Sequence, residues 1–356
     1  MNEDFKKRWE QYKNGELSEA EMIQVEEELE KLEAYQEMLD QEMKDENWDL
    51  SISPEKQKAI LRYGKNKSYL RISTLAVIST LIILPLCTLG SYLYYGLGGH
   101  DSKGNELVQT ASMTVAVTQP NIQIDTDALV NKVKLFGMKA QFPLKKQIGN
   151  VTKIVGNEEV DMFFDQLKPP QVQQYNQELS NEERYFVYPA GLKEKSVAKA
   201  KAILKQLPGG SVTEAFLSFE RSYPTDELYD KLKGYDIRVL WNAIETEDDL
   251  KDHPYAEPIG FPGKDSGRIF KFQHPDQNEN EQFKSALSYM AQHHKWAETI
   301  SGRKDLKLAK RIDYVNQNGI HVYGAVVTGP SKEIERLIEK GPVKTAKVGE
   351  VELWNW

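Results

Sequence analysis

The chain has 356 residues, of which 40% are hydrophobic and 28% are charged, which is enough apolar material for one or two folded domains. Its net charge of -8 excludes the uniformly basic surface on which non-specific nucleic-acid binding depends, so we expect no direct nucleic-acid contact. The single cysteine, Cys87, excludes an internal disulfide framework and any zinc cluster built from several thiolates.

The first fifty residues are strongly acidic. They hold six basic and seventeen acidic side chains, whereas residues 51–71 hold six basic side chains and one acidic. We expect the basic stretch to face anionic lipid, which leaves the acidic stretch free to face a partner. The alternative is that the acidic residues simply form a solvated helix face.

Two helices are predicted in the acidic stretch and a third after it. The first carries Trp9 and Tyr12 on one stripe, and Ser18 and Glu21 have the spacing of a capping box at the start of the second. Ser53-Pro54 begins the third helix, which can continue into the segment that follows. The second helix has a narrow apolar seam with spacings of three and four, formed by Met22, Val25, Leu29, Leu32, Leu39 and Met43.

Three helices in fewer than seventy residues bury little apolar surface by themselves. We therefore interpret residues 1–68 as an all-α cytoplasmic module that a partner protein completes. The alternative is a small autonomous bundle in which the same apolar residues form the core. The candidate contact residues for a partner are Trp9, Tyr12, Met22, Val25, Leu29 and Leu32.

A segment of twenty-four residues without a charge runs from Ile72 to Tyr95. At about 1.5 Å per residue it reaches about 36 Å, enough to cross a hydrocarbon core about 30 Å thick. We therefore predict a single transmembrane helix over residues 69–96. Six basic residues lie shortly before the span and only Lys103 lies in the first stretch after it, which predicts a cytoplasmic N-terminus and an extracytoplasmic C-terminal part at the cell membrane.

Beyond the span, residues 97–110 are polar and rich in glycine, which predicts a flexible linker. Residues 111–170 predict a β-rich region close to the membrane. Its expected strands, at 113–125, 132–142 and 153–164, show the alternation of apolar and polar residues that is typical of β structure.

Residues 180–356 predict an α+β domain. Residues 212–245 have the order strand, helix, strand, and residues 321–354 repeat that order. Each helix follows Pro-Thr or Pro-Ser and ends at Lys-Gly, which indicates two βαβ units in a ferredoxin-like sandwich; the alternative is that common caps are used twice. Further helices are predicted at 196–207, 281–300 and 304–318.

The sequence contains no recognisable catalytic motif. The metalloprotease signature H-E-x-x-H, the nucleophile elbow G-x-S-x-G and the Walker A loop are all absent. His293 and His294 are neighbours on a predicted helix, so they point about 100° apart and are poorly placed to share one metal. We therefore predict a protein that is not an enzyme, with no catalytic residue, cofactor or metal.

The stretch YKNGELSEAEMIQVEEELEKLEAY, residues 12–35, resembles the N-terminal module of anti-sigma factors that restrain extracytoplasmic-function sigma factors in bacteria. The zinc-binding form of that module has His-x3-Cys-x2-Cys on its second helix. The corresponding positions here are Glu28, Leu32 and Tyr35. The resemblance therefore implies a module without structural zinc, held together by apolar residues or by the sigma factor itself.

The run YPAGLKEKSVAKAKAILKQLPGGSVTEAFLSFERSYP, residues 188–224, together with WNAIETEDD at 241–249, resembles the C-terminal domain of the bacterial sigma-factor-regulator family. The span and the β segment after it resemble the N-terminal domain of that family. The resemblance implies that the inner module sequesters an extracytoplasmic-function sigma factor and releases it when the outer domain receives an envelope-stress signal. The expected partners are that sigma factor, membrane lipid and, as a further candidate, a second membrane regulator.

A different class of protein is compatible with the same anchor. It is a membrane-anchored cell-envelope enzyme or wall-binding protein whose cytoplasmic tail is incidental. Such a protein should keep its function when residues 1–50 are deleted, whereas an anti-sigma factor should lose it.

Overall fold

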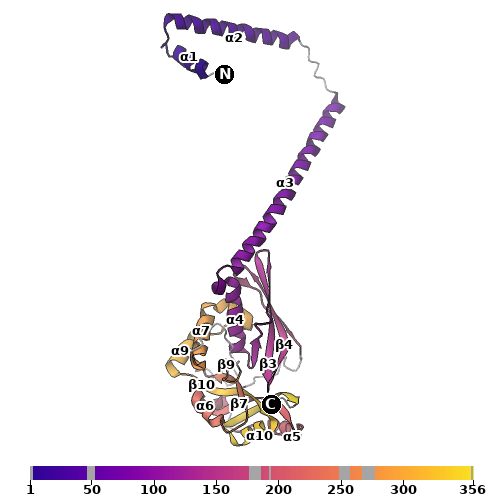
Figure 1. Ribbon diagram of the computed structural model, residues 1–356, viewed down its shortest axis with the longest axis vertical. Helices are drawn as coiled ribbons and strands as arrows, with labels where there is room; N and C mark the ends of the chain where they lie inside the picture. Colours follow the sequence, from indigo (N-terminus) through magenta and orange to yellow (C-terminus); the bar gives the residue numbers. More distant parts are fainter. Residues whose placement is uncertain are drawn as a thin grey trace. The chain divides into compact units, whose positions relative to one another are not determined.

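The computed structural model describes residues 3–45, 53–175, 186–191, 194–247, 257–266, 277–353 and 356. The predicted boundary at residue 180 and the predicted end of the last unit at Trp354 lie outside these described residues. The chain divides into two compact units, Met1–Leu81 and Ile82–Trp356. Helices come first along the chain and two β-sheets follow (Figure 1), so the predicted mixed α+β class is confirmed.

The first unit begins with a helical hairpin of α1 (Glu3–Lys13) and α2 (Glu19–Asp45). The turn between them contains Gly15 at φ 70°, a left-handed conformation that glycine adopts without steric cost. Both helices were predicted, and α2 begins directly after Ser18, where the capping pattern indicated its start.

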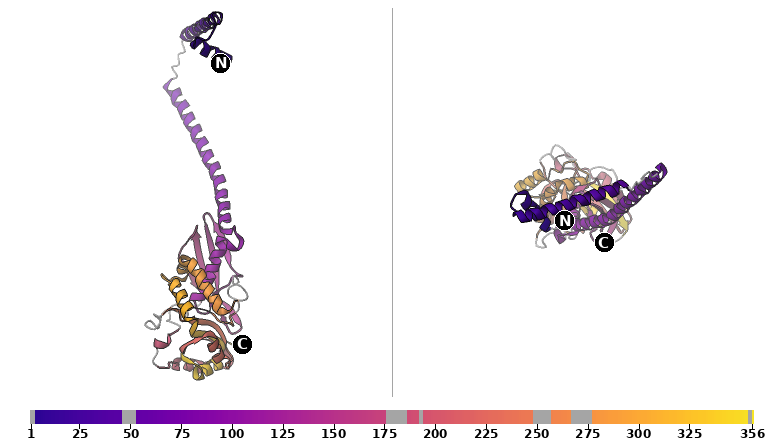
Figure 2. Two further views of the ribbon diagram at one scale, coloured as in Figure 1. Left: turned by 90° about the vertical axis from the view of Figure 1, so that its left-hand side faces the viewer. Right: turned by 90° about the horizontal axis from the view of Figure 1, so that it is seen from above.

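The helix α3 (Pro54–Gly96) has 43 residues and is drawn without interruption in Figure 2. The predicted third helix and the predicted span are therefore one continuous helix. The Ser53 hydroxyl accepts a hydrogen bond from the Lys56 amide at 3.4 Å at its start, and Pro85 lies inside the helix without ending it. Among the described residues, α3 is the one helix long and apolar enough to cross a bilayer.

The predicted linker at 97–110 is wrong from Lys103 onward, and the predicted strand at 113–125 is wrong as far as Thr118, although its last part forms the short strand β1 (Ile122–Ile124). After the short 3₁₀ helix η1 (Gly99–Asp101), residues Lys103–Thr118 form the helix α4, and Ser102 caps it by accepting from the Asn105 amide at 3.3 Å. Apolar side chains occur on more than one face of α4 because both sheets of the second unit pack against it. The sequence therefore lacks a single apolar stripe, and the alternating Thr and Val residues resemble a strand although tertiary burial favours a helix.

The first sheet has a long antiparallel hairpin at its centre, formed by β3 (Gly137–Ile148) and β4 (Val151–Phe163). Side chains alternate between buried and half-buried along β3, and α4 lies on the buried face. The predicted strand at 132–142 is interrupted by a turn at Leu135-Phe136 that separates β2 from β3. The smaller strands are β1 (Ile122–Ile124), β2 (Val130–Lys134), β5 (Gln166–Leu167) and β6 (Gln171–Gln174).

The second sheet contains both predicted strand–helix–strand units. The first is β7 (Ser211–Pro224), α6 (Thr225–Leu232) and β8 (Arg238–Ile244), and the second is β10 (His321–Pro330), α10 (Ser331–Lys340) and β11 (Val343–Leu353). The strand order β11-β7-β10-β8-β9, with antiparallel neighbours, interleaves the two units as in a ferredoxin-like split βαβ fold. The short strand β9 (Gly260–Pro262) adds to one edge, and η3 (Pro189–Gly191) precedes α5 (Ala198–Gln206), which packs beside α10.

The predicted helix at 281–300 is two helices in the structure, α7 (Glu279–Gln292) and α8 (His294–Ser301), which meet at His293. An aromatic stack of His293 on Tyr289, with ring centroids 4.5 Å apart, accompanies this break. The helix predicted at 304–318 begins later, because α9 spans Leu308–Asn318. Asn278 and Glu281 form a complete capping box at the start of α7.

A buried ion network joins the two sheets. The Lys146 ammonium on β3 lies 2.7 Å from the Glu214 carboxylate on β7 and 3.1 Å from the Glu350 carboxylate on β11. The Asn121 amide donates a further hydrogen bond to Glu214 at 2.7 Å. Burial lowers the pKa of Lys146, but the two carboxylates reverse this effect and leave the pKa above its ordinary value. The lysine is therefore charged, and both of its carboxylate partners come from the second sheet.

Candidate partner-binding site

The α1–α2 hairpin holds the residues proposed from the sequence for partner binding. Its interior is small, and Val25 is its one fully buried apolar side chain among the described residues, at 3% exposure. The Tyr12 hydroxyl donates to the Glu26 carboxylate at 3.0 Å, and Arg8 lies 4.0 Å from Glu28. Hydrogen bonding to Glu26 raises the pKa of Tyr12. These contacts hold α1 against the first half of α2.

The start of α2 uses half of the predicted capping box. The Ser18 amide donates to the Glu21 carboxylate at 3.0 Å, as a capping box requires. The Ser18 hydroxyl, however, also donates to that carboxylate, at 2.6 Å, instead of accepting from the Glu21 amide. Both bonds come from Ser18 and lower the pKa of Glu21, so the carboxylate is ionised at the positive end of the helix.

The six candidate residues do not share one environment. Trp9 and Tyr12 are half-buried and stack with ring centroids 5.8 Å apart, and Met22 and Leu29 are also half-buried. Val25 belongs to the core of the hairpin. Leu32, which lies further along α2 than the others, is 52% exposed. The structure therefore places five candidates in the hairpin and one on a free helix face.

The helix lengths explain why that face is free. At about 1.5 Å per residue, the 11 residues of α1 reach about 16 Å, whereas the 27 residues of α2 reach about 40 Å. The second half of α2 thus extends past α1, and its large apolar side chains are exposed. We call this surface the α2 ridge and define it as Leu32, Tyr35, Met38, Leu39 and Met43.

The predicted apolar seam includes Leu39 and Met43, but the predicted contact residues do not. Met38 is missing from both predictions, and Tyr35 is named only as a position that corresponds to a zinc ligand. The greater length of α2 compared with α1 could have indicated this surface. A long apolar seam packed against a short helix must remain partly uncovered. Acidic residues surround the ridge: Glu19–Asp45 holds eleven acidic and two basic side chains. The site combines an apolar ridge with a strongly negative surrounding, which suits a partner with basic residues around an apolar groove.

The positions that correspond to zinc ligands in the related module are also placed by the hairpin. Glu28 faces Arg8, while Leu32 and Tyr35 lie on the α2 ridge. Within the described parts of the chain, no group of three His, Cys, Asp or Glu side chains is arranged to hold a metal ion. The expectation of a zinc-free module stays a prediction.

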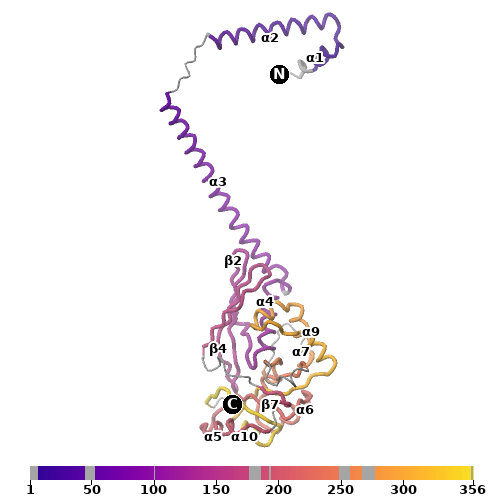
Figure 3. The backbone as a smooth tube through the Cα atoms, turned by 180° about the vertical axis from the view of Figure 1, so that it is seen from behind, coloured from indigo at the N-terminus to yellow at the C-terminus, as the bar shows by residue number. Residues whose placement is uncertain are grey.

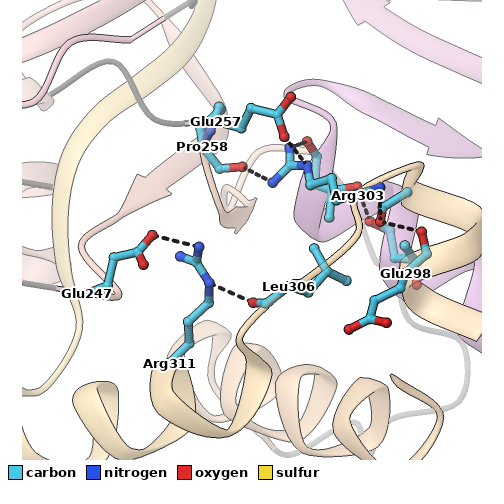
Figure 4. A network of polar contacts seen from close by, with 10 residues as sticks. Glu247, Glu257, Pro258, Glu298, Arg303, Leu306 and Arg311 are labelled. Carbon is cyan, nitrogen blue, oxygen red and sulfur yellow. Dashed lines mark hydrogen bonds and ion pairs between the residues drawn. The ribbon is translucent and has the colours of Figure 1, made fainter. Parts of the chain in front are cut away.

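The second unit contains a polar cluster that is structural in character (Figure 4). The Arg311 guanidinium on α9 contacts the Glu247 carboxylate at 2.6 Å and donates to the Leu306 carbonyl at 2.9 Å. The Arg303 guanidinium contacts the Glu257 carboxylate at 2.8 Å and donates to the Thr118 carbonyl at 2.9 Å. These bonds tie the C-terminal end of α4 and the start of α9 to neighbouring loops.

Comparisons with known proteins agree on one class. A family model described as "sigma factor regulator N-terminal" matches residues 58–153, and a second, described as "sigma factor regulator C-terminal", matches residues 204–350. The chain belongs to this family of sigma factor regulators, which are regulatory proteins and not enzymes.

Over its whole length the chain is similar to one curated relative. The probable anti-sigma-M factor YhdL of Bacillus subtilis (strain 168) is 57% identical over 357 residues, which cover 100% of this chain and 100% of the relative. The α1–α2 hairpin lies outside both family matches but inside this full-length similarity. No solved structure matches the chain.

Proposed function

We propose that this protein is a single-pass membrane anti-sigma factor whose α1–α2 hairpin sequesters an extracytoplasmic-function sigma factor. The full-length similarity to a probable anti-sigma-M factor supports this role, and it favours sigma-M as the partner. The observation that carries the assignment to the hairpin is the α2 ridge, because an exposed apolar face on an acidic helix is costly unless a partner covers it.

The proposed mechanism is competitive burial. A sigma factor has surfaces that contact core polymerase and basic groups that contact promoter DNA, and we propose that the former include an apolar groove. An acidic helix with an apolar ridge is complementary to both kinds of surface, in the manner of a helix that lies in a groove. While the ridge is covered by the sigma factor, the same sigma surface is closed to polymerase. Release would follow an envelope-stress signal received by the second unit.

The proposed orientation has the hairpin in the cytoplasm and the second unit outside. Six basic residues at 56–71 precede the apolar part of α3, and Lys103 is the sole basic residue in the first stretch after it. In this orientation the hairpin lies in the cytoplasm, where the sigma factor is, and both sheets lie in the cell envelope.

The test measures the affinity of the full chain for sigma-M in detergent micelles. Leu32→Ala removes an exposed side chain and leaves the hairpin core in place, so a central contact should lose about 2 kcal/mol or more, which is about thirtyfold in affinity. Gln41→Ala is the matched control: Gln41 is exposed, lies nine residues after Leu32 and so on the opposite face of the same helix, and its substitution should leave binding as in the unaltered chain.

Val25→Ala separates the core from the interface. It should reduce helicity and binding together, because Val25 lies inside the hairpin. Trp9→Ala and Leu29→Ala, both at half-buried positions, should weaken binding with a smaller loss of helicity. Unchanged affinity of Leu32→Ala and Leu29→Ala would contradict the assignment of the sigma factor to this hairpin.

A further inference from the structure

Two exposed phenylalanines occupy neighbouring turns of the first sheet. Phe136 lies in the turn between β2 and β3, and Phe164 follows β4; they are 38% and 47% exposed. Their rings stack with centroids 5.8 Å apart, and Phe164 also makes edge contacts with Phe163 and Tyr94. We call Tyr94, Phe136, Phe163 and Phe164 the aromatic collar.

The backbone of the collar is held in a conformation that bulky residues rarely adopt. Phe136 has φ 57° and Phe164 has φ 51°, both in the left-handed region. The Phe164 amide donates to the Phe136 carbonyl at 3.2 Å, and the Tyr95 hydroxyl lies 3.1 Å and 3.3 Å from the carbonyls of Phe136 and Phe164. The two turns are therefore bound to each other and to the last turn of α3. Local strain of this kind is typical of functional positions.

The position of the aromatic collar along α3 predicts how deep the collar lies in the bilayer. Twenty residues at about 1.5 Å each cross a hydrocarbon core of about 30 Å, so a span that begins at Ile72 leaves the core near Ser91. The Phe136 amide donates to the Ser91 hydroxyl at 2.9 Å. Figure 3 shows β2 reaching the C-terminal end of α3. The collar thus lies at the boundary between hydrocarbon and headgroups, provided that α3 is the span.

We propose that the aromatic collar inserts into the interfacial layer of the bilayer and docks the first sheet directly on the membrane. The partner is lipid, because Phe164 contacts Tyr94 in the last turns of α3, where Tyr92 and Tyr94 are also exposed, and aromatic rings favour the headgroup layer. The membrane would then hold the second unit at two places, by α3 and by the turns of the sheet. A change in the bilayer would then act directly on β3 and β4. Of these strands, β3 carries Lys146, whose ion network joins the two sheets.

The experiment places one environment-sensitive fluorophore at a time on the full chain. Cys87→Ala removes the native thiol, and Phe164→Cys, Val151→Cys or Tyr92→Cys supplies a new one for labelling. The proteins are reconstituted in phosphatidylethanolamine and phosphatidylglycerol vesicles, with or without a nitroxide at carbon 5 of the acyl chain. Val151, 39% exposed, is the matched control because it lies at the opposite end of β4, about 40 Å away at about 3.3 Å per residue.

We expect the nitroxide to lower the fluorescence at Phe164→Cys about twofold, as at Tyr92→Cys, and to leave Val151→Cys unchanged. Quenching at Tyr92→Cys with none at Phe164→Cys would overturn the docking while leaving the span intact. No quenching at either site would overturn the span as well. A label at Phe164→Cys that is instead quenched by aqueous iodide would show a surface free for a protein partner, which also overturns the proposal.

A second pair of variants tests the collar without a label. Asparagine tolerates the left-handed conformation, so Phe136→Asn with Phe164→Asn keeps the turns and removes the rings. In vesicles this double variant should expose the β2–β3 turn to a protease that does not cut the unaltered chain there. In detergent, where no bilayer covers the turn, the two proteins should be cut at similar rates. Equal protection in vesicles would contradict the proposal.

Discussion

Glu158 is the most unusual single residue in the described parts of the second unit. It lies on β4 opposite Phe142, has no exposed surface, and neither oxygen of its carboxyl group has a hydrogen-bond partner. Burial raises the pKa of Glu158 to about 7. An unpaired carboxylate in an apolar interior is costly, so the residue is neutral in the folded protein under mildly acidic conditions.

This residue predicts a dependence of stability on pH. The folded pKa lies above the unfolded value of about 4.3, so the stabilisation is complete below about pH 4 and is lost as pH rises through about 7. The shift corresponds to about 4 kcal/mol. Glu158→Gln should therefore raise the melting temperature of the full chain in detergent at pH 8 and change it little at pH 4.

The comparison is made by thermal unfolding of both proteins across this pH range. Glu159→Gln is a suitable neighbour control, because hydrogen bonds from Lys139 and Gln141 lower the pKa of Glu159. It should not stabilise the protein at pH 8. Equal melting temperatures of Glu158→Gln and the unaltered chain at pH 8 would show that the buried carboxyl is not a source of instability.

The secondary-structure elements are joined by contacts far apart in the chain. The network of Lys146 with Glu214 and Glu350 links β3 to β7 and β11, and α4 lies between the two sheets. The Trp241 indole on β8 donates to the Ala116 carbonyl at 2.7 Å, which fixes α4 to the second sheet. The first sheet is therefore connected to the second sheet through the buried ion network and through α4, which packs against both.

The buried network predicts a large effect of removing one partner. Glu214→Ala leaves the Lys146 ammonium without its nearest counter-ion, and breaking a buried pair costs about 3 to 5 kcal/mol of unfolding free energy. The matched control is Glu352→Ala, which removes the partly exposed ion pair of Lys153 on β4 with Glu352 on β11 and should cost less than about 1 kcal/mol. Thermal or chemical unfolding of the full chain measures both. Similar costs for the two variants would mean that the buried pair contributes no more than a surface pair.

At the scale of the whole molecule, α3 is the one helix among the described residues that is long and apolar enough to cross a membrane. The distribution of charge about this helix predicts its direction in the membrane. Alkaline phosphatase, which is active outside the cytoplasm, should be active when fused after Gly98 and inactive when fused before Lys67. The reverse pattern would place the hairpin outside and would rule out a cytoplasmic sigma factor as its partner.

Several parts of this architecture were predictable from local patterns. The uncharged segment from Ile72 to Tyr95 predicted a membrane helix because a bilayer selects against charge over a fixed length, and α3 is long and apolar enough to cross one. Alternation and Lys-Gly stops predicted β7, α6, β8, β10, α10 and β11, since these elements bury one face or lie in a covered sheet. The seam of α2 predicted an interaction surface, although the pattern could not separate the buried Val25 from the exposed Leu32.

Other features depend on contacts between distant residues. Residues 103–118 became a helix because both sheets cover it, and burial on several faces removes the periodic stripe by which a helix is recognised. Lys146 is two hundred and four residues from Glu350, so no local pattern could indicate that this lysine is buried and paired. The α2 ridge is exposed because α1 is too short to cover it, and the aromatic collar exists because two turns twenty-eight residues apart, at Phe136 and Phe164, meet at the end of α3. Local sequence is sufficient to predict an element whose surface is set by contact with water or lipid. The environment of residues buried between elements is instead decided by the packing of the whole domain.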